Sequence, residues 1–124
     1  MAKRLHTVVC LAAILSLDAP AFAARCSADA SDAGYELIDG HNFLFRFDVE
    51  SDACTDYSCQ GYVHFAIRYR HALTGATSTD RALVRYTIRR GNSRTSVSIE
   101  HHVGATDGTR ILDVAVEEVT CSSP

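Results

Sequence analysis

Residues 63–69 read VHFAIRY, and this segment carries the clearest structural signal in the sequence. Large apolar side chains occupy every second position, whereas the positions between them carry His, Ala and Arg. Successive side chains of a β-strand point to opposite faces, so the alternation predicts a strand with one buried and one wet face. The same period recurs in residues 43–49, 84–89, 97–103 and 112–117. We therefore predict an all-β domain of about six mostly antiparallel strands, largely a meander, that forms a small disulfide-braced sandwich or barrel.

Two glycine-containing turns suit two-residue β-hairpins. Gly91-Asn92 has Gly first, as a type II′ turn requires, and Asp107-Gly108 fits a type I′ turn. Both registers place apolar side chains opposite apolar side chains, whereas a slip of one residue would turn them all to water. The first hairpin pairs Tyr86 with Val97; the second pairs Val103 with Leu112, His101 with Val114, and His102 with Asp113.

Three places break the regular pattern. Gly34–Asp39 is a predicted strand, but a tight turn at Asp39-Gly40 would mix the two faces, so that connection is not a simple hairpin. The stretch from His71 to Asp80 is a predicted long polar loop. The last strand changes phase after Val116, which predicts a β-bulge at Glu117-Glu118.

Residues 1–23 have the three parts of a secretory signal peptide. Lys3 and Arg4 precede the apolar run 7–17, and Ala21-Phe22-Ala23 offers a cleavage site after Ala23. Eleven apolar residues are too few to span a membrane, which takes about 20 in a helix. We expect one soluble domain, residues 24–124, that is periplasmic or secreted, with no membrane span in the mature chain.

The amino-acid composition excludes several classes of protein. The chain has 124 residues, 47% of them hydrophobic and 22% charged, with a formal charge of −3. These values exclude a disordered acidic tail, a collagen repeat, a coiled coil and a strongly basic nucleic-acid arm. They fit a single globular domain.

Four cysteines remain once Cys10 leaves with the signal peptide. In an oxidising compartment they predict two disulfides, Cys54–Cys59 around a tight loop and Cys26–Cys121 between the chain ends. The long bridge would stabilise the domain by about 4–5 kcal/mol through the unfolded state. A zinc site is the competing interpretation, but neither Cys26 nor Cys121 has a ligand neighbour in sequence.

Charge is distributed in blocks. Residues 24–60 carry a net −6, residues 61–95 a net +6 from seven Arg and one acid, and residues 96–124 a net −4. Guanidinium groups match the geometry of carboxylate, phosphate or sulfate, so the central block predicts a binding face for an anionic group or an acidic partner. The alternative is an internal ladder of cross-strand ion pairs. The predicted binding residues share the wet face: Arg68, Arg70, Arg85 and Arg89.

Two other clusters suggest weaker hypotheses. His102 and Asp113 would face each other in the predicted register, and Ser98 lies two positions along, which sketches a hydrolase site. His101 falls among apolar positions and is expected to be a core or rim histidine. A calcium hypothesis rests on four acidic residues near one strand end, although they lack a calcium-loop motif: Asp48, Glu50, Asp52 and Asp56.

The leading interpretation is an exported binding module that recognises a protein or anionic partner through its Arg-bearing face. An inhibitor or immunity-type protein fits this description. We expect no enzyme activity, no cofactor and no metal. We also expect no nucleic-acid partner, because aromatic side chains do not interleave with the arginines. A surface structural or adhesive subunit is one alternative, through strand addition to an open sheet edge. A small hydrolase using His102 and Asp113 is the other.

Overall fold

The computed structural model describes residues 24–123, which form two antiparallel β-sheets and no helix. We call them the β3 sheet, with order β2-β3-β6, and the β4 sheet, in which β4 lies between β5 and β7 and also pairs with β8. The predicted all-β sandwich with about six main strands is confirmed. The strands are β1 Ala24–Arg25, β2 Asp29–Asp39, β3 Asn42–Glu50, β4 Cys59–Arg70, β5 Thr77–Ile88, β6 Arg94–His102, β7 Arg110–Val119 and β8 Ser122–Ser123.

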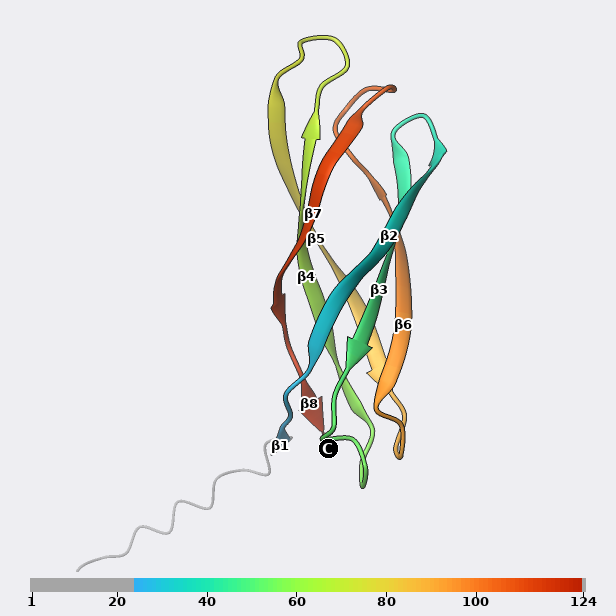
Figure 1. The fold of residues 1–124 in the computed structure, drawn as a ribbon, viewed down its shortest axis with the longest axis vertical. Helices are drawn as coiled ribbons and strands as arrows, with labels where there is room; N and C mark the ends of the chain where they lie inside the picture. Colours follow the sequence, from blue (N-terminus) through green and yellow to red (C-terminus); the bar gives the residue numbers. More distant parts are fainter. Residues whose placement is uncertain (1–23, 124) are drawn as a thin grey trace, which may run out of the picture.

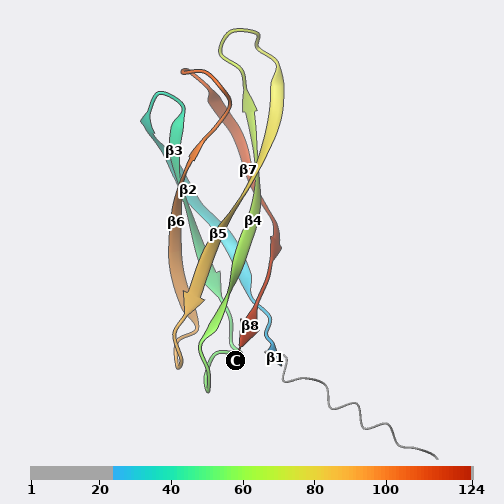
Figure 2. The same ribbon diagram turned by 180° about the vertical axis from the view of Figure 1, so that it is seen from behind.

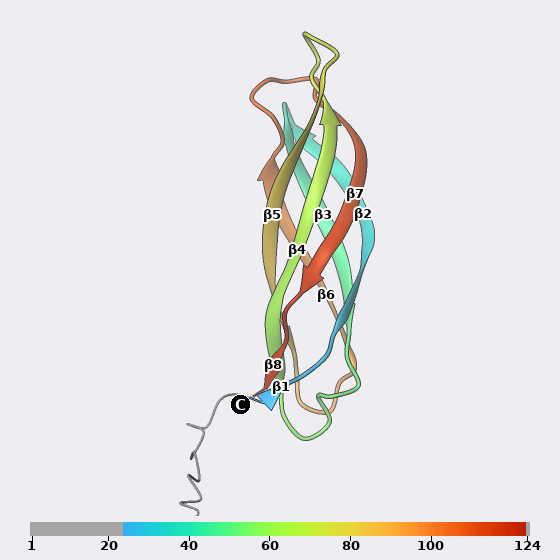
Figure 3. The same ribbon diagram turned by 90° about the vertical axis from the view of Figure 1, so that its left-hand side faces the viewer.

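The molecule is a long, narrow sandwich with its connections at two ends (Figure 1). The β2–β3, β4–β5 and β6–β7 connections lie at one end, which we call the loop end. The β3–β4 and β5–β6 connections lie at the other, together with β1 and β8, and we call it the terminal end. The view from behind shows β5 beside β6 (Figure 2), and the side view shows the two layers (Figure 3).

The core forms where the alternating apolar faces of the two sheets meet. Phe45 and Phe47 of the β3 sheet pack on Phe65 of the β4 sheet, with ring centroids 5.5 and 4.6 Å apart. All three side chains are completely buried. The period of two in the sequence therefore identified the buried face correctly.

The predicted pairing of β5 with β6 is wrong. Tyr86 pairs with Gly61 of β4, and Val97 pairs with Phe47 of β3, so the chain crosses from one sheet to the other between β5 and β6. The turn there is displaced by one residue, because Asn92 N–H donates to the carbonyl of Arg89. In a sandwich, strands of both sheets turn their apolar side chains to the same core. The apolar alternation of two strands can therefore agree although the strands belong to different sheets, and such agreement does not show that they pair.

The predicted β6–β7 hairpin is wrong for the same reason. His101 pairs with Phe43 in the β3 sheet, and Val114 pairs with Ile67 in the β4 sheet. The main strands form only two hairpins, β2–β3 and β4–β5, and the other three connections cross between sheets. The architecture is thus a sandwich but not a meander.

The predicted irregularities are largely confirmed. The β4–β7 register skips Glu117, which is the expected bulge, and a second skip at Leu112 turns Ile111 into the core instead. The β2–β3 hairpin skips Ile38, so it is indeed not a simple one. The polar loop after β4 is shorter than predicted, because β5 already begins at Thr77, and β-branched threonines suit a strand.

Two further predictions concern the chain ends and membranes. The predicted signal peptide, residues 1–23, lies outside the described residues. Between residues 24 and 123 there is no helix long and apolar enough to cross a membrane.

Candidate functional site

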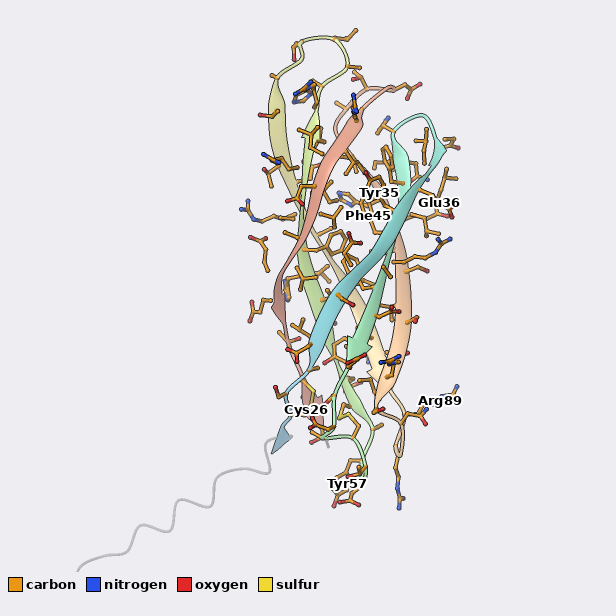
Figure 4. All side chains as sticks on the ribbon, in the orientation of Figure 1. Cys26, Tyr35, Glu36, Phe45, Tyr57 and Arg89 are labelled. Carbon is orange, nitrogen blue, oxygen red and sulfur yellow. A yellow bond between two sulfur atoms is a disulfide. The ribbon has the colours of Figure 1, made fainter. Side chains whose placement is uncertain are left out.

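Three of the four predicted binding arginines lie on the outer face of the β4 sheet. Arg68 and Arg70 are on β4 and Arg85 is on β5, and all three side chains are exposed. Arg89 follows the end of β5 and lies in the β5–β6 connection at the terminal end (Figure 4). The structure therefore does not place Arg89 on the sheet face with the other three.

Arg110 joins this face, and sequence reasoning missed it. It begins β7 and is the direct register partner of Arg70 on β4. Arg68, one step along the same face, stands opposite Thr79 on one side and Asp113 on the other. We call Arg68, Arg70 and Arg110 the Arg cluster. Only the pairing of β4 with β7 reveals it, because Arg110 is about 40 positions from Arg68 and Arg70 in sequence.

The Arg cluster differs from the sheet arginines Arg46, Arg81 and Arg94, which each form an ion pair with an acid. Cross-strand pairs join Arg46 to Glu36 at 2.7 Å and Arg81 to Glu117 at 3.0 Å. A further pair joins Arg94 to Glu50. The internal charge ladder is thus real at those positions. Within residues 24–123, by contrast, no side chain forms a hydrogen bond or ion pair with any of the three guanidinium groups of the Arg cluster.

Arg85 belongs to a different environment. Its guanidinium donates to Oε1 of Gln60 at 2.9 Å and lines a pocket of about 250 Å³ beside Tyr62 and Thr120. Arg85 pairs with Tyr62, six residues from Arg68 along β4, which is about 20 Å at strand spacing. The predicted stripe is therefore two separate groups, one near each end of the sheet.

The proposed hydrolase pair does not form. His102 pairs with Asn42 in the β3 sheet, whereas Asp113 pairs with Arg68 in the β4 sheet. Ser98 lies opposite Arg46 on β3. The register that brought His102 and Asp113 together was the wrong β6–β7 hairpin, so the structural basis of that hypothesis is gone.

His41, His101 and His102 instead lie at the loop end. His41 Nδ1 lies 3.2 Å from Oδ1 of Asp107, and the ring of His102 lies 5.0 Å from that of His41. His101 is half-buried, with Nε2 3.9 Å from Oδ2 of Asp80. It therefore occupies the rim of the core, close to a carboxylate, as expected for an apolar-face histidine.

The acidic residues of the calcium hypothesis are engaged elsewhere. Asp48 accepts a hydrogen bond from Ser96 Oγ at 2.7 Å, and Glu50 pairs with Arg94. Glu50 and Asp52 line an open pocket of about 370 Å³ at the terminal end. Across residues 24–123, however, no carboxylates come together within 4.8 Å as a set of three possible ligands. The geometry gives no support to a calcium site.

Both predicted disulfides are present, Cys26–Cys121 and Cys54–Cys59. The sulfur atoms of Cys26, Cys59 and Cys121 lie within 4.8 Å of one another, so the two bridges are neighbours. All four sulfurs are in bridges, which removes the thiolates that the competing zinc interpretation needs. Structural disulfides are typical of proteins that leave the reducing cytosol.

Beside this sulfur group, β4 and the end of β7 approach closely. Tyr86 Oη donates to the carbonyl oxygen of Thr120 at 2.6 Å, and burial raises the pKa of the Tyr86 phenol. A Cβ at Gly61 would collide with that same carbonyl. The backbone of Gly61 and that of Thr120 therefore approach too closely for a side chain at position 61.

The chain was also compared with known proteins. No protein-family model, curated protein or solved structure matches it.

Proposed function

We propose that this protein is an exported binding module whose Arg cluster holds an anionic group of its partner. The observation that carries the proposal is the pairing of Arg70 with Arg110. Like charges directly opposite each other on neighbouring strands destabilise a sheet. The sheet arginines Arg46, Arg81 and Arg94 form ion pairs with acids, and Arg68 stands opposite Asp113. The facing pair Arg70 and Arg110, by contrast, has no ion pair to an acid among the described residues.

An anion bound between Arg70 and Arg110 would relieve that repulsion. Each guanidinium presents paired N–H donors that fit two oxygens of a carboxylate, phosphate or sulfate. Arg68 extends the site by one step along β4. Because all three side chains are exposed on a sheet face rather than enclosed in a cleft, the site suits an anionic group on a larger surface.

The partner is then a protein with an acidic surface, such as an enzyme that the module inhibits or neutralises. Complementary charge of this kind speeds association and selects the partner. A periplasmic or extracellular location agrees with the two disulfides. Nucleic acid is disfavoured because the chain is acidic overall and the Arg cluster lacks interleaved aromatic rings.

The experiment replaces the Arg cluster and compares it with a matched control. One variant carries Arg68→Gln, Arg70→Gln and Arg110→Gln. The control carries Arg85→Gln, Arg89→Gln and Arg90→Gln, which removes the same charge from exposed positions away from the cluster. Sulfate and citrate are titrated into each protein and followed by NMR amide shifts, with chloride at equal ionic strength as the reference.

Residues beside the Arg cluster should shift with sulfate or citrate in the parent and the control but not in the cluster variant. The immobilised parent and control should also retain an acidic protein that the cluster variant releases. Equal anion shifts in all three proteins contradict the proposal. So do shifts that chloride alone reproduces.

A structural subunit is the second candidate, and the exposure of β2 favours it. Tyr35 and Leu37 pair with the buried Phe45 and Phe43, so they face the core side, yet they are 44% and 57% exposed. Figure 4 shows Tyr35 over Phe45 at this edge. In the described part of the chain, β2 is hydrogen-bonded only to β3. Its other edge lies beside β7 but has no hydrogen-bonded strand, so its backbone groups are available for strand addition.

The charges of the edge strands favour β5 of a second copy of the chain as the strand that is added to β2. β2 carries four acids and no base, so two β2 edges repel, whereas β5 carries Arg81 and Arg85 against one acid. Pairing β2 with β5 of the next copy would give open, head-to-tail polymers. Polymers seen by sedimentation should weaken with salt and disappear in Leu37→Lys but persist in Leu73→Lys. A monomer at every concentration contradicts this assignment.

A further inference from the structure

Three sulfur atoms from different parts of the chain meet at the terminal end. Cys26 follows β1, Cys59 begins β4 and Cys121 precedes β8, and their sulfurs lie within 4.8 Å of one another. The Cys54 sulfur, although bonded to Cys59, is not part of this group of three. The Cys59 sulfur therefore lies within 4.8 Å of both sulfurs of a disulfide to which it does not belong.

The two bridges differ in exposure. Cys54 and Cys59 are completely buried, whereas Cys26 and Cys121 are half-buried, and Cys121 lines the pocket beside Gln60 and Tyr62. An external thiol can thus reach the Cys26–Cys121 bridge more readily than the Cys54–Cys59 bridge. Reactivity of cysteine sulfur follows such access as well as thiolate character.

We propose that the two disulfides form one thiol–disulfide exchange site, which external dithiols enter through Cys26–Cys121. The chemical class of its reactant is a dithiol, whether a small molecule or a protein with two neighbouring thiols. The inference is independent of the Arg cluster, since it rests only on the distances and burial of the sulfurs.

The exchange proceeds by three displacements, the first two of which change the bridges of the protein. A thiolate of the dithiol attacks the Cys26 sulfur, the Cys26–Cys121 bond breaks, and its electron pair leaves on Cys121 as a thiolate. The Cys121 thiolate then attacks the neighbouring Cys59 sulfur. The Cys54–Cys59 bond breaks, and Cys54 leaves as a thiolate that takes a proton from water.

The second thiolate of the dithiol completes the reaction. It attacks the mixed disulfide on Cys26, which forms the oxidised dithiol and releases a Cys26 thiolate. The protein has gained two electrons and keeps one bridge, now Cys59–Cys121. Cys59 begins β4 and Cys121 directly precedes β8, and the next residues along, Gln60 and Ser122, pair with each other. If the first thiolate of the dithiol attacks the Cys121 sulfur instead, the same sequence of displacements leaves a Cys26–Cys59 bridge and the protein again gains two electrons.

The outcome would loosen two segments at once. The 54–59 loop, whose tip carries the exposed Tyr57, loses its closing bond (Figure 4). One chain end loses its covalent tie to the other. A single reduction event at the accessible bridge is thereby transmitted to the buried one.

A matched pair of variants tests this directly. Cys54→Ser and Cys59→Ser each remove the same short bridge and leave one thiol, but only the first leaves it in the sulfur group. Each oxidised variant is held in native buffer at about pH 8, where a thiol is partly ionised. Samples are alkylated with N-ethylmaleimide at intervals and mapped by mass spectrometry without reduction.

In Cys54→Ser we expect exchange to distribute the free thiol, and hence the alkyl label, over Cys26, Cys59 and Cys121. In Cys59→Ser the free thiol should stay on Cys54. We expect the exchange rate to be at least tenfold higher in the first variant than in the second. Both variants should scramble in concentrated guanidinium chloride, which shows that the difference belongs to the native fold. A label confined to Cys59, or equal scrambling of the two native variants, overturns the proposal.

The parent protein provides a second measurement that needs no folded variant. Limiting dithiothreitol should yield a two-electron-reduced species in which Cys59 is linked to Cys121 or Cys26. A reduced species that contains only Cys26–Cys121 or only Cys54–Cys59 overturns the proposal as well.

Discussion

Replacing Arg110 by Gln should stabilise the free protein. Arg110 stands directly opposite Arg70, and within residues 24–123 neither guanidinium has an acidic partner. Removing one of two facing positive charges therefore relieves repulsion without breaking a hydrogen bond or ion pair. A binding residue that weakens its own fold is expected where the missing charge is supplied by a partner.

The magnitude follows from the cross-strand geometry. Side chains that leave directly opposed Cβ atoms hold their charges about 6 Å apart, which corresponds to about 0.7 kcal/mol in water. Screening at 0.1 M salt, where the Debye length is about 10 Å, reduces this to about 0.4 kcal/mol. For a domain of this size the melting temperature should rise by about 2–3 °C.

Urea unfolding of the parent, Arg110→Gln, Arg70→Gln and the double variant measures the coupling. The two single variants should be more stable than the parent at low salt, and the double variant should gain less than their sum. The gain should fade as salt rises. The reference is Arg81→Gln, which loses its ion pair with Glu117 and should not gain stability. An Arg110→Gln protein less stable than the parent at low salt refutes the reasoning.

Three further predictions concern the core and the terminal end. Phe65→Ala removes a fully buried ring that packs 4.6 Å from Phe47, so its free energy of unfolding in urea should fall by about 3–5 kcal/mol. Gly61→Ala places a Cβ against the carbonyl of Thr120 and should cost about 1–3 kcal/mol in the same assay, whereas an unchanged transition contradicts the close approach. Tyr86→Phe loses a hydrogen bond worth about 1 kcal/mol at neutral pH. Because burial raises the pKa of Tyr86, the unfolded state ionises first, so parent stability should fall above about pH 10 and the gap to Tyr86→Phe should narrow there.

The sequence predicted which side chains are buried far better than which strands are neighbours. Alternation placed Tyr86 and Val97 on core faces, and both do face the core. It then paired them, although they belong to different sheets. Hydrophobic phase reports only the direction of a side chain relative to the core, and a sandwich gives that direction to strands of both sheets. Tight turns such as Gly91-Asn92 fit a hairpin, yet here they join strands of opposite sheets.

The same limit explains the outcome for the candidate sites. The alternation of side chains along β4 correctly predicted that Arg68 and Arg70 lie on the outer face. The position of Arg110 beside them follows only from the register between β4 and β7. The two disulfides followed from cysteine count and spacing. The proximity of the two disulfides to each other could not be predicted from the sequence. It depends on how the end of β7 returns beside the start of β4, which no local pattern encodes.

The two proposals can be separated because they occupy opposite ends of one strand. β4 runs from Cys59 in the sulfur group to Arg70 in the Arg cluster, and eleven steps of about 3.3 Å place them about 35 Å apart. Changes at sites this distant normally contribute additively to stability. The Cys54→Ser and Cys59→Ser variants should therefore keep the anion response of the parent, and the Arg cluster variant should keep the parent's sulfur exchange. If a cysteine variant lost the anion response while its β-sheet circular dichroism was intact, the two ends would be coupled through β4, and the rigid-sheet assumption behind both tests would fail.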